Sequence, residues 1–305
     1  MLRLRDWCNF ILLLFLFAGC KNSSKTNPNR DTSLQGAINV CADESFKPVI
    51  DAQVQVYESD HPNVKLNVLY KPEAECLGDL YVDSIRMIVV TRRLSEDEQA
   101  SLLDSIKVAP EQLMVAYDAI AVIVNPDNKT RRFTMNDIRE VLKGNFKENL
   151  IPVFDGLKAT STVRFIVDSV LRGDSLTSKA LAARSSEEVV DYVSKNPGTI
   201  GFIGVSWIGN QDDPQQQSFL TKVILAEIEC KGLPGQYVQP IQVNIYNRLY
   251  PMTRELVLIL KESYKGLGHG FSNFMTTERG QLIFRRAYLV PGYMPFISRP
   301  AKIRE

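Results

Sequence analysis

Short apolar runs alternate along this chain with stretches whose apolar residues recur every three or four positions. The short runs are typical of buried strands, and the spaced residues are typical of amphipathic helices. Near the start of the chain we expect strands over 37–41, 64–70 and 85–90, and helices over 46–59 and 77–84. Strands and helices in alternation predict a parallel sheet covered by helices, which is an α/β fold.

The same alternation continues to the end of the chain. Ser95 is followed by Glu98 in the spacing of a capping box, which opens a helix. The apolar run 115–124 predicts a long strand that the turn residues Asn125 and Pro126 end. Further strands are expected over 151–154, 200–205 and 255–260, and further helices over 134–144, 160–170, 186–196 and around 271–275. Two such units in one chain predict two lobes with a cleft between them.

The amino terminus has the pattern of a secretory signal. Arg3 and Arg5 precede the apolar run 11–17, which ends in Ala-Gly-Cys with the cysteine at position 20. A charged start, a run too short to span a bilayer and small residues at the cut define such signals. The cysteine resembles that of a bacterial lipobox, so we expect Cys20 to carry acyl chains that anchor the chain in a membrane of the cell envelope. Residues 21–36 are polar and read as a tether. The alternative is an ordinary signal peptide with an unrelated cysteine.

Charge and composition exclude several classes of function. Lysine plus arginine (36) nearly balance aspartate plus glutamate (35), and no basic block stands out, so we expect no nucleic-acid partner. The two histidines, His61 and His269, form no cluster with metal-ligand spacing, so we expect no metal and no cofactor. No nucleophile–base pair can be assembled from these residues, and we predict that the chain is not an enzyme.

Three cysteines follow Cys20, namely Cys41, Cys76 and Cys230. An oxidising envelope permits a disulfide, and Cys41 with Cys76 is the pair to test. The alternative is that all three are small buried apolar side chains. The sequence leaves both interpretations open.

Several segments resemble, in order, motifs of the periplasmic phosphate-binding proteins that serve ABC importers. These segments are 115–126, similar to the hinge and first strand of the second lobe; 196–204, similar to Asn-Pro-Gly-x-Ile-Gly-Tyr; 250–254, similar to Tyr-Pro-Leu-x-Arg; and 280–281 with 292–295, similar to the closing helix and tail. The resemblance covers about residues 38 to 297. It implies a two-lobed periplasmic-binding-protein-like α/β fold with two crossover strands (type II). Lobe 1 would comprise 37–117 and 240–305, and lobe 2 would comprise 118–239.

The resemblance also implies a ligand site between the lobes. That family holds its oxyanion without a metal, by hydroxyls, by backbone N–H groups at helix starts and by an arginine. The positions that match its ligand contacts are Ser45, Phe46, Thr91, Arg92, Thr160, Ser161 and Thr162. The alternative for the hydroxyls is simple helix capping, and the alternative for Arg92 is a structural ion pair.

The sequence departs from the family around this site. The family's arginine before Ser-Gly-Thr is absent, and Lys158 is the only nearby cation, which lacks the two-pronged geometry of arginine. The loop after the second strand carries Glu73 and Glu75, which we expect in a solvated turn. Asp43 and Glu44 add negative charge beside the predicted ligand hydroxyl. A carboxylate about 4 Å from an anion costs on the order of several kcal/mol at an effective dielectric near 20.

Two functions follow from these observations. The resemblance implies a binding protein that captures a small, phosphate-like oxyanion between its lobes and delivers it to the membrane subunits of an ABC importer. The alternative is a degenerate binding fold that acts as an envelope sensor or assembly partner and holds no small ligand. The departures also leave open a different anion, or a cationic or zwitterionic solute.

Overall fold

The computed structural model describes residues 30–156, 160–210 and 213–295 of the chain. The chain divides into two compact units, Met1–Arg30 and Asp31–Glu305, and the second unit contains the fold considered below. The predicted signal with Cys20, and also Lys158, lie outside the described residues. Among the helices in the described ranges, none is both long and apolar enough to cross a bilayer.

One lobe, lobe 1, is built on three parallel strands. β1 (Gly36–Asp43) lies between β2 (Val64–Lys71) and β3 (Ile85–Val90) and pairs in parallel with both. From Val40 onward β1 is buried on both faces, because helices cover the sheet on both sides. The helices of one side are α2 (Lys47–Asp60), α10 (Leu267–Thr276) and α11 (Glu278–Arg286), and those of the other side are α3 (Glu73–Asp79) and α4 (Glu96–Ile106).

Local sequence signals set where these helices begin. The capping box predicted at Ser95 is confirmed, since both of its reciprocal hydrogen bonds with Glu98 are present. α3 begins earlier than the helix expected over 77–84, because Pro72 stands at its N-cap and fixes the backbone there. Glu73 and Glu75 therefore lie in the first turn of a helix, where Glu73 is buried and Glu75 is exposed to solvent as expected.

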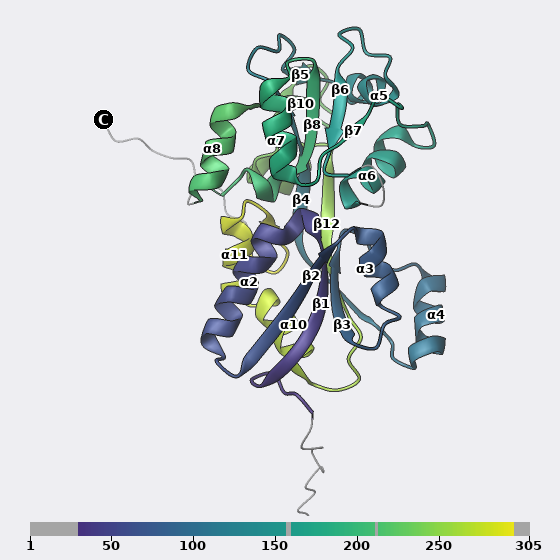
Figure 1. Ribbon diagram of the computed structural model, residues 1–305, viewed down its shortest axis with the longest axis vertical. Helices are drawn as coiled ribbons and strands as arrows, with labels where there is room; N and C mark the ends of the chain where they lie inside the picture. The colour runs from purple at the N-terminus through teal and green to yellow at the C-terminus, as the bar shows by residue number, and fades with distance from the viewer. Residues whose placement is uncertain (1–29, 157–159, 211–212, 296–305) are drawn as a thin grey trace, which may run out of the picture. The chain divides into compact units, whose positions relative to one another are not determined.

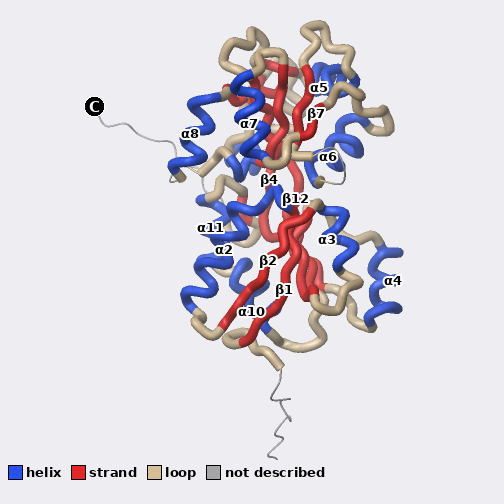
Figure 2. Tube along the Cα trace, viewed as in Figure 1, coloured by secondary structure: helices blue, strands red, loops and turns tan. Residues whose placement is uncertain are grey.

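Two long antiparallel strands connect lobe 1 with the second lobe, lobe 2. β4 (Glu111–Val124) pairs with β12 (Thr253–Leu260) along residues 111–119 and with β8 (Thr199–Gly204) along residues 120–124. The sheet order is therefore β2-β1-β3-β12-β4-β8-β6-β7, and β4 and β12 lie at the junction of the lobes (Figure 2). This is the arrangement with two crossover strands that the sequence predicted.

Lobe 2 extends the sheet with shorter strands. β6 (Ile151–Phe154) pairs in parallel with β8 and with β7 (Leu181–Ala182), and β9 (Ile224–Leu225) pairs antiparallel with β4. A separate small sheet contains β5 (Arg132–Phe133), β10 (Glu227–Glu229) and β11 (Tyr237–Val238). The helices are α5 (Met135–Lys143), α6 (Ser161–Phe165), α7 (Ser186–Lys195), α8 (Pro214–Lys222) and α9 (Gln242–Tyr246). The helix expected over 160–170 forms as α6 followed by the π-helix η3 (Ile166–Leu171). The remaining short elements are η2 (Glu44–Phe46), η4 (Val205–Trp207) and β13 (Val290–Pro291).

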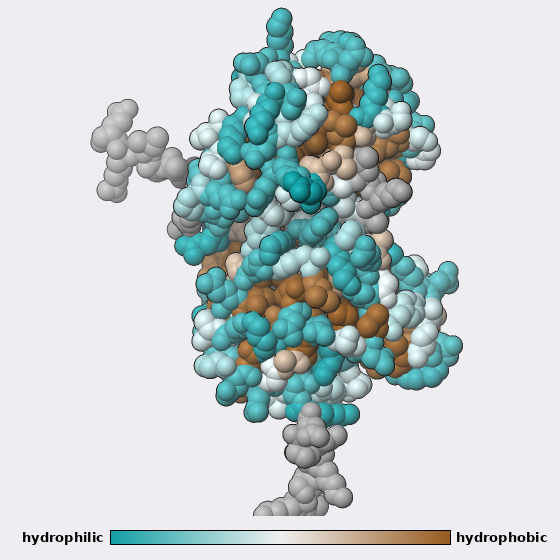
Figure 3. Space-filling model, viewed as in Figure 1, coloured by the Kyte–Doolittle hydropathy of each residue, from teal (hydrophilic) through white to brown (hydrophobic). Residues whose placement is uncertain are grey.

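Each lobe has its own apolar cores, one on each face of the sheet. Those of lobe 1 gather around Phe46, Phe271 and Leu102, and those of lobe 2 around Phe133 and Val190. On the face seen in Figure 3, apolar side chains lie over both lobes and are separated by a more polar band at the level where the lobes meet. The junction between the lobes is therefore a polar layer between two apolar regions.

The start of the compact unit is tied to lobe 1 by Asp31. Its carboxylate accepts hydrogen bonds from Arg86 (2.8 Å to Nη2), from the Tyr264 hydroxyl (2.5 Å) and from the backbone N–H of Leu267 (2.7 Å). These donors hold the pKa of Asp31 at about 2, below its ordinary value, in spite of partial burial. Residues 31–36, which the sequence assigned to the tether, thus belong to the compact unit.

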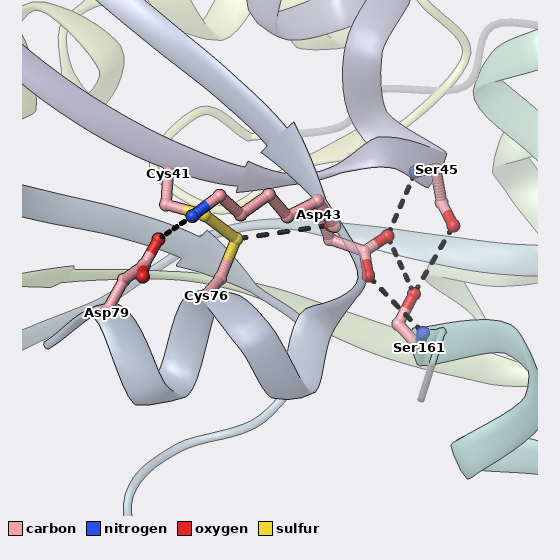
Figure 4. Close-up of a disulfide and its surroundings, with 7 residues drawn as sticks. Cys41, Asp43, Ser45, Cys76, Asp79 and Ser161 are labelled. Atoms are coloured by element: carbon pink, nitrogen blue, oxygen red, sulfur yellow. Dashed lines mark hydrogen bonds and ion pairs between the residues drawn. A yellow bond between two sulfur atoms is a disulfide. The ribbon is translucent and has the colours of Figure 1, made fainter. Parts of the chain in front are cut away.

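Cys41 and Cys76 form a disulfide, with their Cα atoms 5.4 Å apart (Figure 4). Cys230 is a buried free thiol. The bond joins β1 to α3 on the side of the sheet that faces α4. Lys71 adds an ion pair with Asp79 of the same helix at 2.8 Å. The position of α3 relative to the end of β1 is therefore fixed covalently.

Candidate functional site

A cluster of buried polar side chains lies where the carboxyl end of β1 faces the start of α6 across the junction of the lobes (Figures 1 and 4). We call it the interlobe site, and it consists of Asp43, Ser45, Asp155, Ser161 and Arg254. All five residues are buried. β1 and η2 supply the first two, the residue after β6 supplies the third, and α6 and β12 supply the last two. Both lobes therefore contribute to it.

Asp43 stands at the end of β1 and connects the two lobes. Its Oδ1 accepts hydrogen bonds from the backbone N–H of Ser45 (2.9 Å) and from the Ser161 hydroxyl (3.0 Å), and its Oδ2 accepts one from the Ser161 N–H (3.3 Å) (Figure 4). Burial raises the pKa of Asp43, and the charge of nearby Arg254 opposes that rise. The carboxylate is thus surrounded by donors of two different lobes.

Arg254 supplies the positive charge of the interlobe site. Its Nε donates to Asp118 Oδ2 at 2.8 Å, and its Nη1 donates to the Ser161 hydroxyl at 2.9 Å and to Thr162 Oγ1 at 3.5 Å. The guanidinium lies 5.1 Å from the centre of the Phe46 ring. Its Nη2 is buried and finds no hydrogen-bond partner among the described residues. A buried donor without a partner is costly, which marks a place where a ligand acceptor would be favourable.

Asp155 adds a second carboxylate. Its Oδ2 accepts a hydrogen bond from the Ser186 hydroxyl at 3.0 Å and a longer one from the Ser45 hydroxyl at 3.5 Å, while its Oδ1 is buried without a partner in the described part of the chain. Burial, together with the neighbouring charge of Asp43, raises the pKa of Asp155 to about 6. Partial burial and nearby carboxylates likewise raise the pKa of Glu44 to about 7. The interlobe site is therefore acidic in spite of its arginine.

The loop that carries Ser45 is fixed from lobe 2 through its backbone. The Trp207 indole N–H donates to the Ser45 carbonyl at 2.8 Å, and the Ser206 hydroxyl donates to the same oxygen at 3.4 Å. The indole N–H of Trp207 thus positions the loop that carries Ser45. Pro48 in the first turn of α2 holds the following backbone in helical conformation.

A second polar contact joins the lobes beside the interlobe site. Glu73 of α3 is almost fully buried and pairs with Arg164 of α6, and Glu73 Oε1 also accepts from the Thr91 N–H (2.6 Å) and hydroxyl (2.7 Å). Arg164 Nη2 donates to the Thr91 hydroxyl at 2.8 Å. The pKa of Glu73 is lowered, because these hydrogen bonds and the charge of Arg164 outweigh the effect of burial. The expectation of a solvated Glu73 was wrong, since the helix that starts after Pro72 turns its side chain towards lobe 2.

The structure brings some of the predicted ligand residues together and separates others. Ser161 and Thr162 both contact Arg254, and the Ser45 hydroxyl lies 3.4 Å from that of Ser161. Phe46 lies beside the guanidinium of Arg254. Thr160 caps α6 by accepting the Val163 N–H at 3.3 Å, as the capping alternative proposed. Thr91 binds Glu73 and Arg164. Arg92 forms two 2.7 Å hydrogen bonds with Glu98, so its side chain has the structural ion pair that was its alternative.

Sequence reasoning missed the two arginines that bring positive charge to the junction. Arg254 lies within the matched segment 250–254, and its signal is a charged residue near the start of a strand whose last five residues, 256–260, are apolar. Arg164 follows Ser161 at helical spacing and so lies on the same face of α6. Asp118 and Asp155 were likewise not proposed as members of the site. In the described residues there is no group of three or more histidine, cysteine or acidic side chains that could hold a metal ion.

Comparison with known proteins places this architecture in a family. The sequence profile of the PBP superfamily domain matches residues 22–279. The chain belongs to the PBP superfamily. Its relatives in this superfamily include the phosphate-binding protein PstS of Borreliella burgdorferi, which is 20% identical over 288 residues that cover 89% of this chain and 92% of the relative. The predicted relationship to phosphate-binding proteins of importers is confirmed.

Solved structures of the superfamily show the same fold. A Clostridium perfringens phosphate ABC transporter substrate-binding protein with bound phosphate aligns with a TM-score of 0.69 at 18% identity and covers 84% of this chain and 99% of its own. An ABC-type phosphate transport receptor from Vibrio cholerae aligns with a TM-score of 0.63 at 16% identity, covering 84% and 100%. At these identities the likeness confirms the two-lobed α/β fold and leaves the ligand to be argued from the interlobe site.

Proposed function

We propose that this PBP superfamily chain captures a small oxyanion of the phosphate type at the interlobe site and delivers it to the membrane subunits of an ABC importer. The observation that carries the proposal is Arg254, whose guanidinium is buried between the lobes. Its Nη1 donates to two hydroxyls, and its Nη2 has no partner within residues 30–156, 160–210 and 213–295. Charged donors in a water-poor site are the groups that hold an oxyanion most strongly. The names of the relatives, which are phosphate-binding proteins, support the same ligand class.

The second carboxylate of the site, Asp155, favours an oxyanion that carries a proton. An ionised Asp155 can only accept hydrogen bonds, and its Oδ1 has no partner in the described part of the chain, so a fully ionised anion beside it is repelled. A hydrogen phosphate ion has an O–H that donates to such a carboxylate, whereas sulfate at neutral pH has none. The interlobe site therefore suits phosphate better than sulfate.

The placement of the protein follows from its amino terminus. We propose that Cys20 carries the lipid anchor, that the polar residues after it form a tether, and that the lobes face the periplasm or the exterior. The division at residue 240 expected from the sequence is moved, because Ile245 of α9 and Met252 pack in the core of lobe 2. Lobe 1 is proposed to comprise 31–117 and the chain from β12 onward, and lobe 2 to comprise 118–252, with importer subunits contacting both. No enzymatic step is proposed for the interlobe site, because its function is to bind and release.

The direct test is a thermal melt of residues 21–305 with and without phosphate, with sulfate and chloride at equal ionic strength. A ligand at a hundred times its dissociation constant stabilises by about 2.7 kcal/mol. We expect the melting midpoint to rise by several degrees with phosphate and to change little with sulfate. A flat response to every anion would contradict the proposal and favour the alternative, a degenerate fold that serves as an envelope sensor or assembly partner.

A matched pair of variants assigns the response to the interlobe site. Ser161→Ala removes the hydroxyl between Arg254 and Asp43, and a hydrogen bond to a charged group contributes about 1.5–3 kcal/mol. We expect phosphate affinity to fall by about tenfold or more in Ser161→Ala. Ser105→Ala, on the exposed face of α4, is the control and is expected to bind like the wild type. Equal affinities of the two variants would show that phosphate binds elsewhere.

A further inference from the structure

Asp43 makes contacts of the kind that a bound anion makes. Three donors converge on its carboxylate, the N–H of Ser45 from lobe 1 and the N–H and hydroxyl of Ser161 from lobe 2. Oxyanions in proteins are held by the same groups, backbone N–H and hydroxyl donors backed by an arginine. The arginine is also present, because Arg254 Nη1 donates to the Ser161 hydroxyl that in turn donates to Asp43.

The capping role of Asp43 explains only one of these contacts. An aspartate at the end of a strand commonly accepts the N–H two residues later, and the bond to Ser45 is of this kind. The two bonds from Ser161 are not local, since they come from a helix of the other lobe and cross the junction. The carboxylate is buried among further charges. Burial raises the pKa of Asp43, the positive charge of Arg254 lowers it, and the negative charge of Glu73 raises it. Removing an acidic side chain from water in this way is unfavourable unless its donors are well placed.

We propose that Asp43 is an internal ligand, a carboxylate of the chain itself that occupies the donors of the interlobe site and that an incoming oxyanion must displace. The proposal rests on the proposed function for the identity of the site, and it adds how the affinity of that site is set. An oxyanion that takes the Ser161 donors competes with Asp43 for them. The apparent affinity is then the intrinsic affinity multiplied by the fraction of molecules in which Asp43 has released these donors.

The internal ligand also acts on the lobes. Because Asp43 belongs to β1 and Ser161 belongs to α6, their hydrogen bonds draw lobe 1 and lobe 2 together as a bound anion would. Hinge closure in two-domain binding proteins is normally driven by ligand contacts to both domains. We therefore expect a closed arrangement in which the chain supplies part of those contacts itself.

Two substitutions test the proposal, measured by titration calorimetry with inorganic phosphate on residues 21–305, which contain the whole compact unit. Asp43→Gly removes the internal ligand, and Asp43→Asn keeps its shape but removes its charge. Asp104→Asn removes the same charge from a highly exposed position on α4 and is the matched control. We expect both Asp43 variants to bind phosphate at least about tenfold more tightly than the wild type, and the control to be unchanged.

Small-angle scattering of the phosphate-free proteins gives a second measurement. We expect the radius of gyration of Asp43→Gly to exceed that of the wild type and to return to the wild-type value when phosphate is added. Circular dichroism shows whether each variant is folded. Folded Asp43 variants that bind phosphate no more tightly than the wild type, and scatter like it, would overturn the proposal.

The outcomes separate this proposal from the proposed function. Wild-type binding with no gain in the variants supports phosphate capture and overturns the internal ligand. No wild-type binding with clear binding by Asp43→Gly supports the internal ligand and overturns phosphate capture by the natural chain. Folded proteins that all fail to bind phosphate overturn both.

Discussion

Removing the Cys41–Cys76 disulfide should destabilise the protein by an amount that its sequence spacing sets. The two cysteines are 35 residues apart, and the cross-link restricts this loop in the unfolded chain. The chain-entropy relation for a loop of that length gives about 4 kcal/mol at 25 °C. For chains somewhat shorter than this one, each kcal/mol corresponds to about 2–4 °C, so we expect the melting midpoint to fall by roughly 8 °C or more.

The assay compares the wild type with the double variant Cys41→Ala and Cys76→Ala, each melted with and without a reductant that lacks thiols. Reductant should lower the wild-type midpoint towards that of the variant and leave the variant unchanged. Cys230→Ala is the control, because this thiol is buried but unpaired, and it should keep the full response to reductant. Mass spectrometry after alkylation counts the free thiols. An unchanged wild-type midpoint after verified reduction would refute the loop-entropy reasoning.

Three further predictions follow from the junction and the amino terminus. Glu73→Gln loses a charged hydrogen bond to the partly exposed Arg164, so we expect about 2 kcal/mol less stability in urea unfolding at pH 7. Because the pKa of Glu73 is lowered in the folded protein, its carboxylate contributes to stability above pH 4.5, and this contribution is lost as the pH falls through the folded-state pKa. The difference in stability between the wild type and Glu73→Gln should therefore vanish in acid. An equal difference at all pH values would contradict this prediction. Asp155 has a pKa raised to about 6, so its contribution is present at low pH and lost as the pH rises through 6. Asp155→Asn should therefore be more stable than the wild type at pH 8, by up to about 3 kcal/mol, and no gain over Asp104→Asn there would refute the assignment. Cys20→Ser should move the protein from the detergent phase to the aqueous phase, and continued membrane partition would show an anchor other than the lipidated cysteine.

The fold was largely predictable because its signals are local. The apolar runs that become β3 and β12, the capping box at Ser95 and the turn at Asn125 are all decided by neighbouring residues. The start of α3 was misplaced because Pro72 was interpreted as a turn and not as the residue that opens a helix. That two strands, β4 and β12, connect the lobes could be predicted only from the family resemblance, because no single motif shows which strands pass from one lobe to the other.

The interlobe site was predictable only in part, because it depends on contacts between residues far apart in the sequence. Ser45 and Ser161 could be found from their positions at helix starts. Arg254 lies on a strand that returns from the far end of the chain, and nothing near it in sequence indicates that it meets Ser161. The same applies to Glu73 with Arg164, whose pairing follows from the closed junction and not from any local pattern.

The attachment of Asp31 to lobe 1 has a mechanical consequence under the proposed lipid anchor at Cys20. Any pull along the tether reaches the compact unit first at Asp31, where Arg86 of β3, Tyr264 and the start of α10 share the load. The force therefore enters lobe 1 and does not pass through β4 or the contact between Asp43 and Ser161. Lobe 2 can move about the crossover strands without being strained by the membrane attachment. With the proposed anchor, a pull on the chain would act on lobe 1 alone and leave the two lobes free to open and close.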